Sequence, residues 1–130
     1  MIRFIALSFA VLATTLAAPA LAQATTINVA GKLSNGAYVQ VVCSVGANGQ
    51  ITGTGVLFGT NPGNGMAYKY PFVVVRGATT SGKLVLTGYF AGTTIPVTVS
   101  ASVPDGPLTL SYIVNGVTYT LTGMGKVTVN

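Results

Sequence analysis

The stretch TLSYIVNGVTYTLT, residues 109–122, decides the fold of this chain. The dipeptide Asn115-Gly116 at its centre signals a two-residue type I′ turn, because both residues tolerate the positive φ that this turn requires. Counting outward from the turn, one face receives apolar and aromatic pairs and the other mostly hydroxyl groups. The first face holds Val114 with Val117, Tyr112 with Tyr119 and Leu110 with Leu121; the second holds Ile113 with Thr118, Ser111 with Thr120 and Thr109 with Thr122. This pattern is typical of an antiparallel pair with one buried face, so we expect both tyrosines to pack in the core with their hydroxyls at its rim.

A second turn signal, Asn48-Gly49, predicts a longer loop. A two-residue loop at this point would pair Val45 with a threonine and mismatch the two faces. A three-residue loop over residues 47–49 instead pairs Val45 with Ile51, and strand register follows such face matching. We therefore expect the longer loop, with Gly49 in the left-handed region.

The same alternation of apolar and hydroxyl residues predicts further strands at residues 25–30, 69–76, 83–90 and 94–100. About eight antiparallel strands, joined mostly by short turns, predict an all-β domain: a meander that closes as a small β-barrel, or alternatively a two-sheet β-sandwich. Residues 72–75 are apolar on both faces, so their strand is expected to be central or covered. Glycines on the apolar parity permit strong curvature or close approach of strands. They are Gly53, Gly55, Gly88 and Gly123.

Residues 1–22 show the three parts of a secretory signal peptide. Arg3 supplies the positive charge, residues 4–16 form an apolar run, and residues 20–22 form a small-x-small cleavage site. The run is too short for a membrane helix, which takes about 20 apolar residues. We expect cleavage before Gln23, one all-β domain over residues 23–130, and export from a bacterial cell to the periplasm or the extracellular space.

Ionisable side chains are scarce. The chain has no His, one acidic residue (Asp105) and six basic residues, of which Arg3 leaves with the signal peptide and lowers the formal charge from +5 to +4. General acid–base catalysis and metal binding need groups that this composition lacks. We therefore expect a non-enzymatic protein without a cofactor or a metal site. The basic residues stand singly along the sequence, whereas nucleic-acid binding favours clustered Lys and Arg, so nucleic acid is not an expected partner.

Three features resemble catalytic machinery and none fits. Residues 77–83 (GATTSGK) match G-x-x-x-x-G-K but lack the following hydroxyl residue and the helix of a phosphate loop, so we expect a hairpin turn. A pair of Ser81 with Lys83 would need a buried lysine of lowered pKa, and a lysine at the mouth of a turn is solvated. Cys43 has no His partner. We expect it to pack as a small buried side chain facing Gly53; a disulfide to another chain is the alternative.

The best binding candidates surround the longest irregular stretch, residues 59–66. Asn61 and Asn64 lie within it, and Tyr68 and Tyr70 follow it with aromatic faces that a ligand can stack on. An ordinary surface connection is the alternative interpretation.

Three classes of function remain open. The first is an exported non-enzymatic β-domain that acts in binding or in cell-surface or extracellular assembly, with a small ligand, a carbohydrate or a second copy at a strand edge as partner. The second is an outer-membrane barrel, whose strands take about ten residues and end in aromatic girdles; the strands predicted here are mostly shorter, and the aromatic residues do not mark their ends. The third is a Ser–Lys hydrolase.

Overall fold

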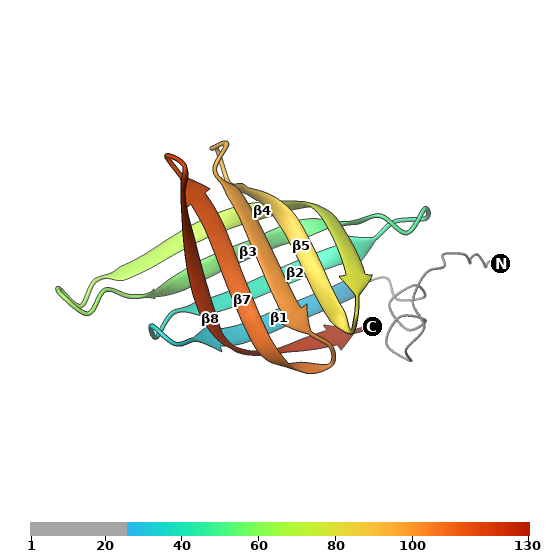
Figure 1. Cartoon of the computed structure of the whole chain (residues 1–130), viewed down its shortest axis with the longest axis horizontal. Coiled ribbons are helices and arrows are strands. Elements are labelled where there is room, and N and C mark those ends of the chain that lie inside the picture. Colours follow the sequence, from blue (N-terminus) through green and yellow to red (C-terminus); the bar gives the residue numbers. More distant parts are fainter. Residues whose placement is uncertain (1–25) are drawn as a thin grey trace.

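The computed structural model describes residues 26–130, which form a closed barrel of eight antiparallel strands in sequence order (Figure 1). The prediction of a small barrel is confirmed, and the sandwich alternative is wrong because β1 and β8 pair and close the sheet. The expected signal peptide lies outside the described residues. In the part of the chain that the structure describes, no helix has the length and hydropathy to cross a membrane. The strands are β1 (Thr26–Leu33), β2 (Tyr38–Val45), β3 (Ile51–Thr60), β4 (Ala67–Thr80), β5 (Lys83–Phe90), β6 (Pro96–Ser102), β7 (Asp105–Val114) and β8 (Val117–Val129).

Alternate side chains of every strand point into the barrel and form one core. In β2, for example, Val39, Val41 and Cys43 are buried, whereas Gln40 and Val42 between them are exposed. Among residues 26–130 the buried side chains are all apolar. Eight strands enclose an interior just wide enough for side chains to fill. The hydrophobic effect on this inward set is therefore the main force that holds the barrel together.

The predicted turns are confirmed. Val114 pairs with Val117 across Asn115-Gly116, and both turn residues have positive φ, 51° and 77°. In the β2–β3 hairpin the amide of Gly46 donates to the carbonyl of Gln50, which leaves a three-residue loop with Gly49 at φ 83°. The segment that resembles a phosphate loop is the β4–β5 hairpin, where only two residues separate the strands.

Strand β4 departs from its prediction in two ways. It spans 14 residues, and β3 runs on to Thr60, so the irregular stretch shrinks to residues 61–66 at the tip of a projecting hairpin (Figure 1). It is flanked by β3 and β5, as expected of a central strand, but its outward valines, Val73 and Val75, are 42% and 45% exposed, so the alternative of a covered strand is wrong. The pairing of β4 with β5 shifts register between Val74 and Arg76, a β-bulge that bends the strand around the barrel.

Two inward glycines show why the barrel needs them. A Cβ on Gly88 would overlap the backbone carbonyl of Val73 on the neighbouring strand, because the strands coil tightly beside the bulge. A Cβ on Gly55 would overlap the ring of Phe72, its cross-strand partner. The predicted role of these glycines in curvature and close approach is confirmed.

Replacing Gly88 with Ala should destabilise the protein by about 3 kcal/mol, because backbone must move to accept the added methyl group. The matched control is Gly46→Ala, where the nearest atom would lie 3.4 Å from the new Cβ and the backbone is not left-handed. Urea unfolding followed by circular dichroism measures both. Equal midpoints for the two variants would contradict the close strand approach at Gly88.

Candidate functional site

One end of the barrel carries a connected series of six aromatic rings. They occupy inward positions on β4, β5, β7 and β8, at the end where the β3–β4, β5–β6 and β7–β8 hairpins lie (Figure 1). Neighbouring rings have centroids 5.2–6.3 Å apart, within the range of favourable aromatic pairs. In order of contact the series is Tyr68–Tyr70–Phe90–Tyr112–Tyr119, with Phe72 packed edge-on against Phe90. We call these six residues the aromatic end.

The aromatic end runs from the core out to solvent. Phe72 is 2% exposed, and Tyr68, Phe90 and Tyr112 are partly buried against the core. Two other rings of the series are more exposed: Tyr70, its second member, is 54% exposed, and Tyr119, its last member, is 46% exposed. Phe90 contacts Tyr70 and Tyr112 contacts Tyr119, so partly buried rings support the two exposed ones.

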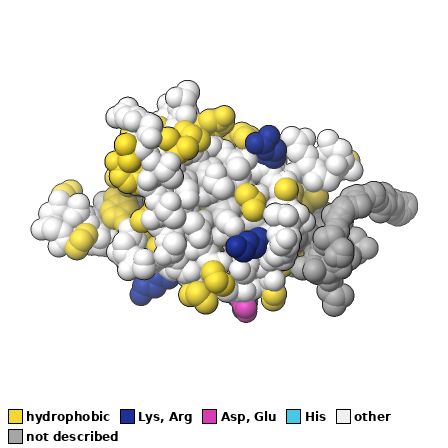
Figure 2. Space-filling view, viewed as in Figure 1, with side chains coloured by type: hydrophobic (Ala, Val, Ile, Leu, Met, Phe, Trp, Pro, Cys, Tyr) yellow, Lys and Arg dark blue, Asp and Glu magenta, His cyan; other side chains and the backbone are white. Residues whose placement is uncertain are grey.

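Exposed aliphatic side chains lie on two hairpins of the same end. Met66 on the β3–β4 hairpin is 66% exposed, and Val117, which shares the parity of Tyr119 at the β7–β8 hairpin, is 50% exposed. Figure 2 shows hydrophobic side chains gathered at the upper left, where the β7–β8 hairpin lies in Figure 1. Exposed hydrophobic side chains gathered at one end of a small protein mark an interaction site more often than an isolated apolar residue does.

The structure brings together only half of the predicted binding residues. Tyr68 and Tyr70 lie side by side, with ring centroids 5.5 Å apart. Asn61 Oδ1 accepts a hydrogen bond from the amide of Gly63, and Asn64 Oδ1 accepts one from the amide of Met66. These asparagines therefore shape the hairpin tip, and a binding role for them stays a prediction.

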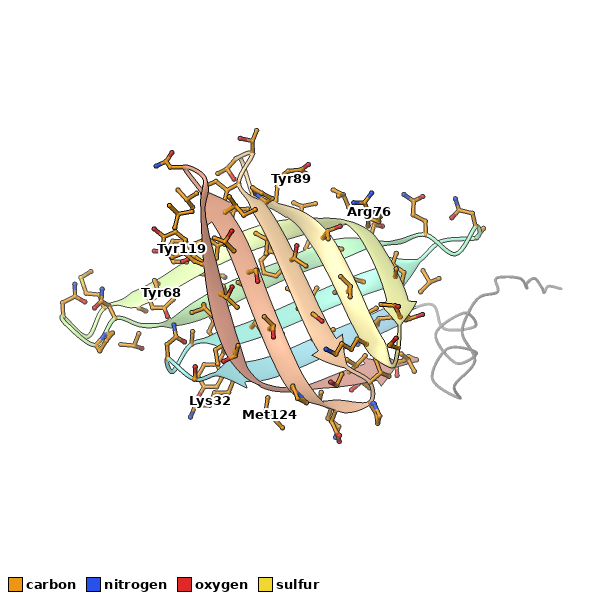
Figure 3. All side chains as sticks on the ribbon, viewed as in Figure 1. Lys32, Tyr68, Arg76, Tyr89, Tyr119 and Met124 are labelled. Carbon is orange, nitrogen blue, oxygen red and sulfur yellow. The ribbon has the colours of Figure 1, made fainter. Side chains whose placement is uncertain are left out.

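Sequence reasoning missed Phe90 and misjudged Tyr119. It predicted the pair of Tyr112 with Tyr119 correctly, and the rings stack at 5.2 Å. The expectation of core packing is confirmed for Tyr112 and is wrong for Tyr119, because the hairpin extends past the filled part of the barrel. Figure 3 shows Tyr119 and Tyr68 at the same end of the molecule, although they are far apart in the sequence. A usable signal was present, since all six rings share the inward parity near a hairpin.

The groups considered for catalysis lie apart from the aromatic end. Ser81 and Lys83 are exposed on the β4–β5 hairpin, at the other end of the barrel. Cys43 is buried on the inward face opposite Gly53, as predicted, and burial raises the pKa of its thiol to about 11. At neutral pH this thiol is protonated and therefore a poor nucleophile.

Comparisons of the chain with protein-family models, with curated proteins and with solved structures give no significant match. Its function must therefore be inferred from the residues of the molecule itself.

Raising the pH from 9 to 11 should lower the stability of the wild-type protein relative to that of Cys43→Ala. The thiol loses its proton near pH 9.0 in the unfolded chain and near pH 11 in the folded one. Its contribution to stability is therefore complete below pH 9 and is lost as the pH rises toward 11. Urea unfolding of both proteins across this range measures the difference. Parallel pH profiles would show that the thiol is not buried in the folded state.

Proposed function

We propose that this chain is an exported, non-enzymatic binding domain that binds a saccharide on the aromatic end of its barrel. The observation that carries the proposal is the pair of half-exposed tyrosines, Tyr70 and Tyr119, held by a connected series of inner rings. The C–H face of a sugar ring packs on an aromatic face, and a tyrosine hydroxyl at the rim adds a hydrogen bond. Rings that are already fixed lose little conformational freedom when a ligand binds.

The filled interior supports recognition at the surface. All eight strands contribute buried side chains to one core, and within the described residues these buried side chains are apolar. A ligand inside the barrel would have to displace this core. The ends and the outer face are the surfaces open to a partner.

Closure of the barrel removes the basis for assembly through strand edges. Each of the eight strands pairs with a neighbour on both sides, so within residues 26–130 no strand offers an unpaired edge to a second copy. Self-association would have to use the aromatic end, and it would then compete with a saccharide for Tyr70 and Tyr119.

The polarity of the two faces supports a barrel that works in water. Strands β3, β4, β7 and β8 are longer than predicted and aromatic rings do gather at one end, so those two arguments against a membrane barrel no longer hold. A membrane barrel, however, turns an apolar band outward. Here exposed valines on the outer face of β2 and β4, Val42, Val73 and Val75, do not continue into a band around the barrel, because the outward positions of β6–β8 are rich in hydroxyl groups. They include Thr98, Ser100, Thr109, Ser111, Thr118, Thr120 and Thr122.

Replacing Tyr70 or Tyr119 with Ala should each lower saccharide affinity about 10-fold, because exposed, preorganised aromatic side chains dominate such contacts. The control is Tyr89→Ala, which removes a tyrosine of similar exposure, 45%, on the outward face of β5 and outside the ring series (Figure 3). Isothermal titration against a panel of soluble neutral and acidic oligosaccharides provides the measurement.

Two results would overturn the proposal. One is the absence of binding to every oligosaccharide of the panel. The other is a concentration-dependent dimer, seen by sedimentation, that Tyr119→Ala dissociates while no saccharide competes with it.

A further inference from the structure

The outer face of β1–β4 carries a single row of four side chains that the aromatic end does not include. Lys32 pairs with Tyr38, Tyr38 with Phe58, and Phe58 with Lys69, so the row crosses four neighbouring strands. Their chain neighbours Leu33, Val39 and Leu57 are buried, which turns the row outward. We call these four residues the Lys–aromatic row.

The row has a cation at each end and two stacked rings between them. The rings of Tyr38 and Phe58 have centroids 5.6 Å apart and planes inclined by 22°. Lys32 Nζ lies 5.7 Å from the centroid of the Tyr38 ring, within the range of a cation–π contact. With a strand spacing of about 4.8 Å, the Cα atoms of the two lysines lie about 14 Å apart along the row. This length suits an extended ligand better than a single small ion.

A groove of about 620 Å³ on β2–β4 contains three of the four residues of the row, and Lys32 lies outside its lining. Tyr38, Phe58 and Lys69 belong to its lining, and Gln40 and Thr60 add polar groups. Tyr68 also lines this groove and contacts the ring of Tyr70, so the groove borders the aromatic end. The remaining lining residues are Val56, Gly59 and Ala67.

The positive charge of the row has no acidic neighbour. Asp105 is the one acidic residue of the chain, and it pairs in register with Lys126 on β7 and β8. The cross-strand neighbours of Lys32 are Tyr38 and Met124, and that of Lys69 is Phe58. Figure 3 places Lys32 and Met124 together along the lower edge of the barrel, toward the end that carries Tyr68. Unopposed charge beside a groove raises the local concentration of anionic ligands.

We propose that the Lys–aromatic row binds an acidic saccharide chain, with sugar rings on Tyr38 and Phe58 and carboxylates at Lys32 and Lys69. This inference rests on the proposed function, since it names the class of saccharide. Gln40 lies beside the row and supplies an amide that both donates to and accepts from sugar hydroxyls. A saccharide suits the row better than a bound peptide strand, because peptides add to sheet edges and this barrel has none within the described residues.

The test compares an oligogalacturonate with its fully methyl-esterified form, which has the same sugar rings without the charge. Titration calorimetry on the whole exported protein should show tighter binding of the charged form, weakening as salt is added. Lys32→Gln and Lys69→Gln should each lower its affinity about 3- to 5-fold. Lys126→Gln makes the same charge change at the partner of Asp105 and is the matched control, expected to leave affinity unchanged.

Several outcomes would overturn the inference. Equal affinity for the charged and esterified forms would remove the role of the lysines. A second contradicting result would be equally tight binding of poly-glutamate, or of vesicles containing anionic lipid, with the same loss of affinity in Lys32→Gln and Lys69→Gln. The partner of the row would then be another acidic ligand and not a saccharide. If the esterified form binds equally tightly and its binding depends on Tyr70 and Tyr119, the inference about the row fails and the proposed function stands. If neither form nor any other saccharide binds, the inference and the proposed function both fail.

Discussion

The pairing of β1 with β8 is the constraint on which the rest of the molecule depends. Seven cross-strand pairs, from Ile27 with Val129 to Leu33 with Gly123, turn a meander into a closed cylinder. Closure divides every strand into inward-facing and outward-facing residues, and glycines in the narrow interior allow a strand or a large side chain to approach closely. Gly88 and Gly55 serve this purpose, one beneath a neighbouring carbonyl and the other beneath the ring of Phe72.

Closure also determines where a partner can bind. A barrel without free edges cannot recruit a partner strand, and apolar core side chains occupy the inward positions of all eight strands. The inward parity continues past the core on β4, β5, β7 and β8, where rings replace aliphatic side chains and emerge at Tyr70 and Tyr119. The outward-facing side chains differ in chemistry around the barrel. Strands β1–β4 carry cations and aromatic rings, and β6–β8 carry hydroxyl groups.

Features that depend on neighbouring residues were predictable from the sequence. The turn at Asn115-Gly116, the three-residue loop before Gln50 and the hairpin at Ser81 follow from face matching over a few residues. The sequence did not decide between a barrel and a sandwich, because the strands whose pairing decides it are the first and the last, β1 and β8. The exposure of Val73 was misjudged for the same reason, since only the closed topology shows that no second layer covers β4.

The candidate site was half predictable. Tyr68 and Tyr70 were singled out because they stand next to a loop, whereas Phe90 and Tyr119 join them only through the pairing of distant strands. Asn61 and Asn64 were chosen by composition, and composition does not show that their side-chain oxygens accept hydrogen bonds from the hairpin backbone. The Lys–aromatic row was not predicted because its four residues lie on four different strands and become neighbours only through the pairing of those strands.

Amide hydrogen exchange at β1 and β8 tests the closed barrel most directly. In an open sheet these two strands would be edges, with every second amide facing water and exchanging quickly. Closure predicts continuous protection across both strands, from Ile27 to Leu33 and from Gly123 to Val129, comparable to that of β2–β7. Alternating fast exchange confined to β1 and β8 would contradict closure, and with it the account of where a partner can bind.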